Sequence, residues 1–227
     1  MNMQDQNVTI QAEEYLEAIY RLESKDGTAK TMELSRTLNV VPGSITNTIE
    51  NLERKGLVIH QPYRGVKLTE NGRRIASQIL RRHRLAERLL TDFLQLDWSE
   101  VHDPACKLEH AFSAEIMKAL EKALGHPKKC PHGNPIPTNC GAVFEEKTVP
   151  LNELDPKMCG VVAKITDEKA EILKQLARNN VTPGKTVHVE SVSDGSCVIR
   201  VENKVCTIDD KLASVVHIKL TKGGESD

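Results

Sequence analysis

The sequence gathers imidazole, thiol and carboxylate side chains between His83 and His110. His83 and Glu87 are four residues apart, the spacing that places two side chains on one face of a helix. A second stretch of helical spacing carries four more such groups, which fall within about a quarter turn of each other at roughly 100° per residue. These four are His102, Cys106, Glu109 and His110.

Imidazole, thiolate and carboxylate are the ligands of borderline divalent ions such as Fe²⁺, Mn²⁺, Co²⁺, Ni²⁺ and Zn²⁺. Any one of these residues alone is more typical of a solvated polar position than of a metal ligand. Six of them on two adjacent helices favour a metal site. The sequence therefore predicts a divalent-metal centre on two amphipathic helices joined at residues 96–99.

Two predicted helices must position these groups. Apolar periodicity predicts a long helix over about 70–94, which carries His83 and Glu87. A second helix carries Cys106 and is predicted to continue to about Leu124. Its apolar stripe lies beside the ligand face and is expected to pack on the long helix or on a second subunit.

The N-terminal part has the pattern of a winged helix. Helices are predicted over 10–24, 31–38 and 44–55, with a turn at Pro42-Gly43 before the third, and two short β runs at 57–60 and 66–69 form a hairpin. The third helix begins with short polar side chains that can approach base edges, and the hairpin tip is basic. The candidate DNA-binding residues are Thr31, Ser44, Thr46, Asn47, Thr48, Tyr63 and Arg64.

The C-terminal part is predicted to be a small SH3-like β-barrel. Its expected strands lie at 151–165, 186–192, 197–201, 204–208 and 215–220, with one helix over 167–178. Residues 125–149 are rich in Pro, Gly and Asn and are interpreted as a linker. Cys130, His132 and Cys140 in this stretch are candidate metal ligands, but the linker interpretation is preferred.

Composition narrows the function classes. Aromatic residues make up only 3% of the chain, which argues against stacking on single-stranded bases. A polar N-terminus and the absence of a long apolar run predict a cytoplasmic protein with no membrane segment, so the six cysteines are expected to be thiols or ligands. Residues 1–84 hold 13 Lys and Arg against 10 Asp and Glu, a balance of +3 in a chain of net charge −1, which suits DNA contact there.

Four segments carry a family resemblance: HRLAERLLTDFLQLD at 83–97, VHDPAC at 101–106, LEH at 108–110 and GNPIP at 133–137. With the order of elements above, the chain resembles, over nearly its whole length, the diphtheria toxin repressor family of metal-dependent transcriptional repressors.

The resemblance implies a mainly α fold with α+β parts, arranged in three domains. A winged helix-turn-helix domain is expected over 1–74, and a helical metal-binding and dimerisation domain over 75–140. An SH3-like domain of the FeoA type is expected over 141–227.

The resemblance also implies two metal sites per subunit. The regulatory site maps to Glu14, Cys106, Glu109 and His110. The ancillary site maps to His83, Glu87 and His102, completed from the barrel, where Glu168 and Glu171 are the candidates.

The first of these ligand sets mixes two metal preferences. The iron regulators of the family carry Met where this chain has Glu14, and the manganese regulators carry Asp there. The manganese regulators also have Glu in place of Cys106 and use a further Glu that matches Glu17. A carboxylate favours Mn²⁺ and a thiolate favours Fe²⁺, Co²⁺ or Zn²⁺, so Fe²⁺ is expected, with Mn²⁺ as the alternative and Co²⁺, Ni²⁺ and Zn²⁺ as surrogates in vitro.

The predicted function is a metal-activated repressor of iron or manganese homeostasis genes. Divalent metal would lock a homodimer for binding to a double-stranded DNA operator. One alternative is a manganese-responsive regulator of the same family, and another is a winged-helix sensor of an organic ligand, which would leave the His/Cys/Glu face unexplained. A metal hydrolase is disfavoured because no HExxH motif is present, so no enzyme activity is expected. A metal-storage or metal-delivery role for the barrel alone is a further alternative.

Overall fold

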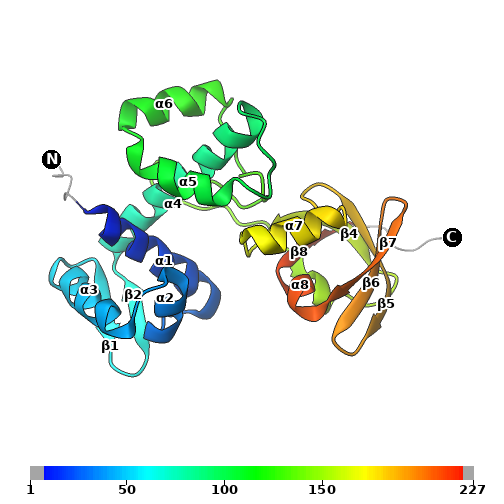
Figure 1. Ribbon diagram of the computed structural model, residues 1–227, viewed down its shortest axis with the longest axis horizontal. Coiled ribbons are helices and arrows are strands. Elements are labelled where there is room, and N and C mark those ends of the chain that lie inside the picture. The colour runs from blue at the N-terminus through cyan, green and yellow to red at the C-terminus, as the bar shows by residue number, and fades with distance from the viewer. Residues whose placement is uncertain (1–7, 222–227) are drawn as a thin grey trace. The chain divides into compact units, whose positions relative to one another are not determined.

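The computed structural model describes residues 8–221 (Figure 1). The chain divides into two compact units. The first unit comprises Met1–Arg82 and Pro137–Val143, and the second comprises His83–Ile136 and Phe144–Asp227. The long helix α4 (Glu70–Asp92) therefore contributes its first part to one unit and its remainder, from His83 onward, to the other. Among the described residues, no helix is long and apolar enough to cross a membrane.

The first unit is a winged helix, as the sequence predicts. Its helices are α1 (Ile10–Asp26), α2 (Thr31–Leu38) and α3 (Pro42–Arg54), followed by the antiparallel strands β1 (Val58–Gln61) and β2 (Gly65–Leu68). Helix α3 begins two residues earlier than predicted because a proline is well suited to the first helical turn. The helices enclose an apolar core whose largest fully buried members include Leu16, Ile19, Leu34, Ile45 and Leu52.

A close contact fixes the start of α4 against the wing. The hydroxyl of Thr69 accepts a hydrogen bond from the Gly72 N–H at 3.1 Å and donates one to the carbonyl of Gly56 at 2.8 Å. A Cβ at Gly72 would lie 1.9 Å from the carbonyl oxygen of Leu57. Only glycine lets the helix approach the backbone this closely.

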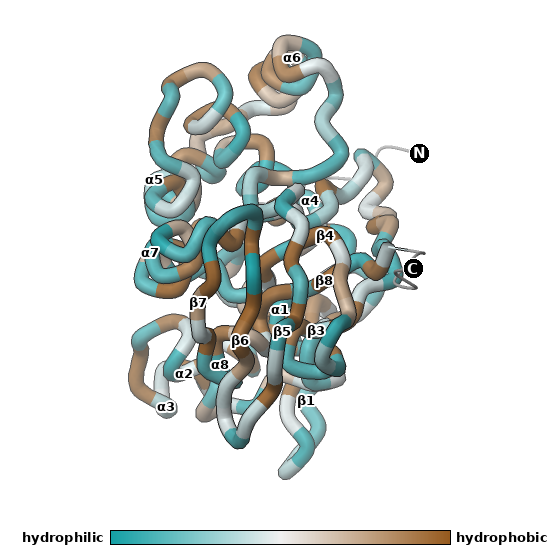
Figure 2. The backbone as a smooth tube through the Cα atoms, turned by 90° about the vertical axis from the view of Figure 1, so that its right-hand side faces the viewer, coloured by the Kyte–Doolittle hydropathy of each residue, from teal (hydrophilic) through white to brown (hydrophobic). Residues whose placement is uncertain are grey.

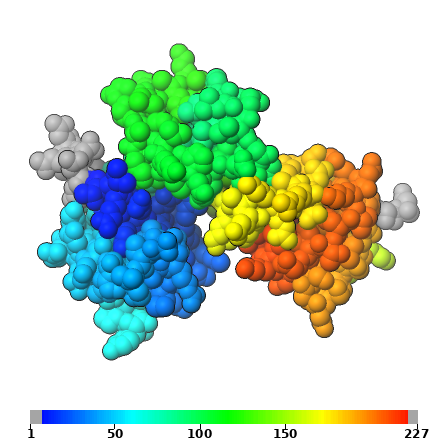
Figure 3. Space-filling view, viewed as in Figure 1, coloured from blue at the N-terminus to red at the C-terminus, as the bar shows by residue number. Residues whose placement is uncertain are grey.

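The wing ends in a tight turn at Gln61–Arg64. The Arg64 N–H donates to the Gln61 carbonyl at 3.0 Å, and Tyr63 adopts a φ of 64° at the turn. Gly65 follows with a φ of 109°, and a Cβ there would meet the Ala29 carbonyl at 2.6 Å. The tip therefore presents Tyr63 and Arg64 to solvent. The wing is the cyan segment in Figure 3.

The helices of the second unit depart from prediction at one point. Helix α5 (His102–Leu108) and the 3-10 turn η1 (Glu109–Ala111) end before α6 (Ala114–Ala123), so the predicted continuous helix to Leu124 is wrong. The hydroxyl of Ser113 accepts a hydrogen bond from the Ile116 N–H at 3.3 Å and caps α6. A side chain that caps a new helix favours a break in the preceding one.

The C-terminal part of the second unit is a six-stranded antiparallel sheet of the SH3-like kind. The strand order is β3-β8-β4-β5-β6-β7. The strands are β3 (Val149–Pro150), β4 (Cys159–Ile165), β5 (Thr186–Ser193), β6 (Ser196–Val201), β7 (Lys204–Asp209) and β8 (Val216–Leu220). Apolar and polar residues alternate along several of these strands, as Figure 2 shows, so one face packs on a core with α7 (Ala170–Arg178) and α8 (Asp210–Ser214).

Three sequence expectations for this region need correction. The predicted strand over 151–165 begins only at Cys159, after the 3-10 turn η2 (Leu151–Glu153). Helix α7 begins at Ala170 rather than at 167, and α8 was not predicted. The stretch from Cys130 to Pro137 is not a flexible linker but an ordered and largely buried loop.

Candidate metal centre

Three of the predicted ancillary ligands meet in the second unit. His83 and Glu87, one turn apart on α4, are both completely buried. His83 Nε2 lies 3.1 Å from Glu87 Oε1 and 3.1 Å from Nδ1 of His102, at the start of α5. The i, i+4 spacing on α4 thus brings two donors to one point, and the N-terminus of α5 adds a third.

The barrel adds Glu168 and not Glu171. Glu168 Oε2 lies 3.6 Å from His102 Nδ1, and the residue is 5% exposed. Because α7 begins only at Ala170, Glu168 lies in the preceding loop and reaches inward, whereas Glu171 is in the first helical turn and exposed. We call His83, Glu87, His102 and Glu168 the ancillary group.

Cys130 and His132 extend this cluster. His132 Nδ1 lies 3.2 Å from Glu87 Oε1 and 3.6 Å from Glu168 Oε1. Cys130 Sγ lies 4.0 Å from both His132 Nδ1 and Glu168 Oε1. Both residues are buried. Cys140, the third candidate in this stretch, is exposed and forms a hydrogen bond with the hydroxyl of Thr138. We call Glu87, Cys130, His132 and Glu168 the cysteine group.

A sequence signal for these two residues was available. The run CPHGNPIP contains no carboxylate, Lys or Arg, although the surrounding chain is highly charged. Such a run is more typical of a buried loop than of a solvated linker.

The 130–137 loop is held rigidly against the barrel. The Ile165 N–H donates to the His132 carbonyl at 2.9 Å, and the Cys130 N–H donates to the Asn134 carbonyl at 2.9 Å. Gly133 has a φ of +84°, and a Cβ there would lie 2.1 Å from the Ala163 carbonyl oxygen. A glycine is therefore required for the loop to pack this closely on β4.

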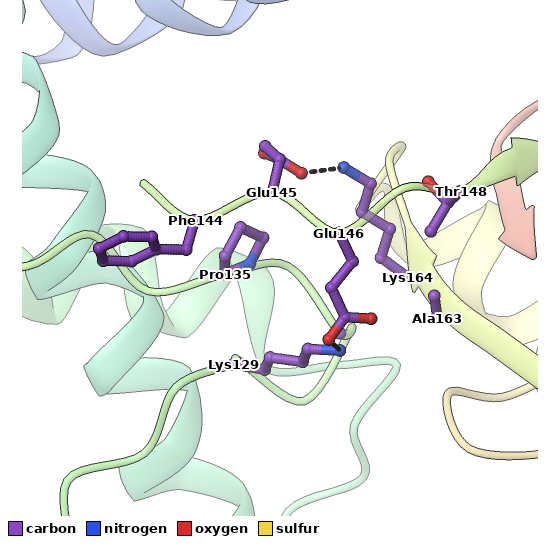
Figure 4. Close-up of a pocket in the computed structure, with 9 residues that line it drawn as sticks. Lys129, Pro135, Phe144, Glu145, Glu146, Thr148, Ala163 and Lys164 are labelled. Carbon is purple, nitrogen blue, oxygen red and sulfur yellow. Dashed lines mark hydrogen bonds and ion pairs between the residues drawn. The ribbon is translucent and has the colours of Figure 1, made fainter. Parts of the chain in front are cut away.

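A small pocket beside this loop is lined by paired charges (Figure 4). Lys129 contacts Glu146 at 3.0 Å and Lys164 contacts Glu145 at 2.5 Å. These ion pairs tie the segment after Phe144 to the loop and to β4. Because both carboxylates face a lysine, we assign this pocket a structural role.

The predicted regulatory ligands of the second unit contact the ancillary group. Glu109 Oε2 lies 2.7 Å from His83 Nδ1, and Glu109 Oε1 lies 3.4 Å from Nε2 of His110. Cys106 Sγ lies 3.8 Å from His83 Nδ1 and 3.9 Å from Nε2 of His102. Cys106 is thus placed within reach of two predicted ancillary ligands.

The remaining predicted ligands lie on α1 of the first unit. Glu14 is exposed. Glu17 is 8% exposed, and its Oε1 lies 2.8 Å from Arg21 Nη2.

The three histidines of the cluster are basic. Burial opposes protonation of His83, but the charge on Glu87 and the hydrogen bond with Cys106 outweigh it and raise the pKa of His83 well above its usual value. Burial also opposes protonation of His102, yet hydrogen bonds with Cys106 and Glu87 raise its pKa to about 9. The pKa of His132 is raised in the same way, by hydrogen bonds with Cys130 and the two carboxylates.

The acidic groups respond to these cations. Burial alone would raise the pKa of Glu87. The charge on His83 and hydrogen bonds from three histidines lower it by more than burial raises it, so the pKa of Glu87 lies well below its usual value. Burial also works against the Cys106 thiolate, but hydrogen bonds with His102 and His83 lower the pKa of that thiol. The pKa of the Cys130 thiol is raised, first by burial and then by the charge of Glu87.

The donor set suits a divalent cation. It combines imidazole nitrogens, carboxylate oxygens and thiols in a buried region, which are the ligands of Fe²⁺, Co²⁺ and Zn²⁺. Glu87 Oε2 is buried and, among the described residues, has no hydrogen-bond partner. A buried carboxylate oxygen without a partner is costly unless a cation compensates it.

The predicted DNA-binding residues lie on the surface of the first unit. Ser44, Thr46 and Asn47 are exposed on α3, and Thr48 is half-buried. Thr31, the first residue of α2, is half-buried as well.

Comparison with protein families covers most of the chain. Residues 7–66 match the family described as the N-terminal DNA binding domain of iron dependent repressors. Residues 69–138 match the family described as their metal binding and dimerisation domain. Residues 149–220 match the FeoA domain.

Individual relatives agree with this assignment. The iron-dependent repressor IdeR of Mycobacterium leprae is 32% identical over 220 residues, which cover 91% of this chain and 96% of the relative. The diphtheria toxin repressor of Corynebacterium diphtheriae is 31% identical over 217 residues, covering 91% and 96%. The crystal structure of T. acidophilum IdeR is 29% identical, covers 97% of this chain and 100% of its own, and has a TM-score of 0.81. A manganese-dependent transcriptional repressor in complex with manganese is 28% identical, covers 92% and 99%, and has a TM-score of 0.87.

Proposed function

The chain belongs to the iron-dependent repressor family of transcriptional regulators, and we propose that it is a metal-activated repressor that binds its operator as a homodimer. The winged helix would contact double-stranded DNA, and the buried cluster of the second unit would bind divalent metal. We assign it no catalytic activity.

One observation carries this proposal, namely that three of the four residues of the ancillary group are buried. His83 and Glu87 are inaccessible to solvent, and Glu168 comes from a different part of the chain to join them. Burying several ionisable groups costs several kcal/mol of folding free energy unless they are paired or bind a metal. A divalent cation supplies positive charge where these carboxylates converge, and its ligands must give up protons to bind it.

We assign the regulatory site to Glu14, Cys106, Glu109 and His110, as the family resemblance implies, with Glu17 as an alternative carboxylate. The position of Glu109 supports a coupling between the two sites. Its two oxygens face His83 and His110 separately, so one carboxylate belongs to the surroundings of both. A change at His83 would therefore alter the geometry at His110.

We propose Fe²⁺ as the physiological metal, with Mn²⁺ as the second candidate. The neighbouring histidines favour the thiolate form of Cys106, and a thiolate selects softer ions than Mn²⁺. The carboxylate of Glu14 favours the opposite choice. Relatives named for iron and for manganese both match this chain.

Homodimerisation would double the DNA contact. A two-fold axis would present two α3 helices to paired half-sites of one operator. Asn47 is exposed on α3 and can form two hydrogen bonds to adenine, while Arg64 at the wing tip can neutralise a phosphate.

Fluorescence anisotropy with DNA from upstream of the chain's own gene tests this function. We expect tight binding with Fe²⁺ under anaerobic conditions, weaker activation with Mn²⁺, and loss of binding with chelator. The variant His110→Ala should fold but lose metal-dependent binding. Glu171→Gln, an exposed carboxylate next to the cluster in sequence, is the matched control and should behave as wild type.

Equal affinity for DNA with chelator and with metal would overturn the proposal. That result would favour a winged-helix sensor of an organic ligand. Stronger activation by Mn²⁺ than by Fe²⁺ would keep the class and reverse the choice of metal.

A further inference from the structure

We propose that the cysteine group binds a second cation beside that of the ancillary group, so that Glu87 and Glu168 bridge a pair of metal ions. This cation is additional to the two sites of the proposed function. The inference takes from the proposed function only that the ancillary group binds a metal ion. The ligands of the new position are Glu87, Cys130, His132 and Glu168.

The four donor atoms of the cysteine group already surround one point. All of them lie within 4.8 Å of one another, and all four residues are buried. Bond lengths of about 2.0–2.3 Å in a tetrahedral site place neighbouring ligand atoms roughly 3.3–3.8 Å apart. The 3.2 Å between Glu87 and His132 and the 3.6 Å between His132 and Glu168 match this spacing, and the 4.0 Å contacts of Cys130 need only a small contraction.

Both carboxylates face two ligand sets at once. Glu168 turns Oε2 toward His102 and Oε1 toward His132 and Cys130. Glu87 places Oε1 near His83, His102 and His132, and its Oε2 has no hydrogen-bond partner among the described residues. Glu168, whose two oxygens face separate sets of donors, is arranged as a bridging ligand of a two-metal site, and Glu87 faces both sets through the single oxygen Oε1.

The orientation of His132 is that of a metal ligand. Its Nε2 lies 2.8 Å from the carbonyl oxygen of Trp98, which can only accept a hydrogen bond. Nε2 therefore carries a proton, and Nδ1 is the atom that faces the carboxylates. Metal-binding histidines are commonly held this way, with the distal N–H bonded to a carbonyl or carboxylate.

Asn134 orients the bridging carboxylate. Its amide donates to Glu168 Oε1 and to the carbonyl of Ile165, both at 2.8 Å. Glu168 thus keeps one position relative to the rigid 130–137 loop that supplies Cys130 and His132. A site whose donors are held before binding loses little conformational freedom when the ion binds.

The donors define the class of ion. One thiolate, one imidazole and two carboxylates suit Zn²⁺, Fe²⁺ or Co²⁺, whereas Mg²⁺ and Ca²⁺ prefer oxygen ligands only. The contrasting arrangement is a single ion shared among all the donors. The two arrangements differ in the number of ions that each chain binds and in whether Cys130 is a ligand of its own ion.

Cobalt titration of the full chain separates these arrangements. We would use the variant Cys106→Ser, because Cys106 is another thiol in contact with the histidines. Bound Co²⁺ is counted by equilibrium dialysis, and thiolate ligation is read from the thiolate-to-cobalt charge-transfer absorption. Cys106→Ser should keep this absorption, and adding Cys130→Ser should abolish it and remove one Co²⁺ per chain.

Two further variants control the result. Adding Cys140→Ser to Cys106→Ser removes an exposed thiol ten residues away in sequence and should change neither readout. Adding His132→Gln tests the same ion without touching the cysteine and should also remove one Co²⁺ per chain. Circular dichroism of each variant in chelator checks that it is folded. If the Cys130 variant does not fold, the Co²⁺ count of the His132 variant is the test of the proposed site.

The proposal is overturned if Cys106→Ser shows no thiolate absorption, or if the Cys130 and His132 variants bind as much Co²⁺ as their parent. Failure of the proposed function has a different signature. DNA binding indifferent to metal, together with a cobalt ion lost on mutation of Cys130, would remove the repressor mechanism and leave this site in place.

Discussion

Helix α4 contributes its first part to an apolar core in the first unit and its second part to a polar centre in the second. In the first unit Ala76 and Ile79 join a cluster of aliphatic side chains, and the residues predicted to contact DNA lie mostly on the surface. In the second unit His83 and Glu87, only one or two turns further along, are buried among ionisable groups. Of the buried polar residues in the described chain, three belong to the first unit and seven to the second.

This difference indicates that the second unit, and not the first, depends on a bound ligand for part of its stability. An apolar core is stable without a partner because its burial is favourable in itself. In the polar centre the carboxylates face histidines whose raised pKa values favour the protonated form, so that histidine and carboxylate charges balance each other. Removing one member leaves a buried charge without compensation, which typically costs about 3–5 kcal/mol.

The largest effect is expected from Glu87→Gln. This change removes a ligand from both metal groups while keeping the size of the side chain. Saturating metal at 1,000 times its Kd should stabilise the wild type by about 4 kcal/mol per ion, and most of this gain should be lost in the variant. Thermal unfolding with and without metal measures it, with Glu171→Gln as control. A full metal-induced rise in Tm for Glu87→Gln would contradict the assignment.

Gly133→Ala tests the rigidity of the loop that carries Cys130 and His132. The new Cβ would clash with the Ala163 carbonyl, and φ of +84° is unfavourable for alanine, so we expect a loss of about 2–4 kcal/mol in the free energy of unfolding. The matched control is Gly184→Ala, where φ is +90° and nothing lies within 4 Å of the added Cβ. The control should lose only about 1–2 kcal/mol. Equal losses in urea denaturation would show that the close contact is unimportant.

Asn47→Ala should affect DNA and leave the metal centre alone. Loss of a base contact from α3 should weaken operator binding by about 1–3 kcal/mol, while metal affinity and Tm stay unchanged. Anisotropy titration measures the first and metal-dependent unfolding the second. Asn203→Ala, an exposed change between β6 and β7, is the control. A changed metal affinity in Asn47→Ala would contradict the expectation that this residue acts on DNA binding alone.

Arg64→Ala should have the smallest effect. A phosphate contact at the wing tip adds affinity without sequence preference, so the variant should bind all DNA somewhat less tightly. The slope of log affinity against log salt concentration should fall in magnitude by about 1 for each subunit's lost contact. Lys211→Ala on the exposed side of α8 is the control. An unchanged salt slope would place Arg64 away from the phosphates.

Most of the fold could be predicted because its signals are local. Apolar periodicity located α1 and α4, and two short β runs after the third helix located the wing hairpin. The break between α5 and α6 was not predicted. A serine such as Ser113 can either continue a helix or cap a new one, and the sequence alone does not decide between these two roles. Helix α8 is five residues long and too short to show a period.

The sequence by itself determined those parts of the metal centre whose donors are neighbours along the chain. His83 and Glu87 share a face because four residues make about one helical turn. Tertiary structure alone decided the rest. Glu168 was one of two equally spaced candidates until the start of α7 turned it inward, and Cys130 and His132 resembled linker residues until Gly133 let their loop pack on β4. Contacts between donors 36 to 81 residues apart depend on how whole elements pack, which no local pattern records.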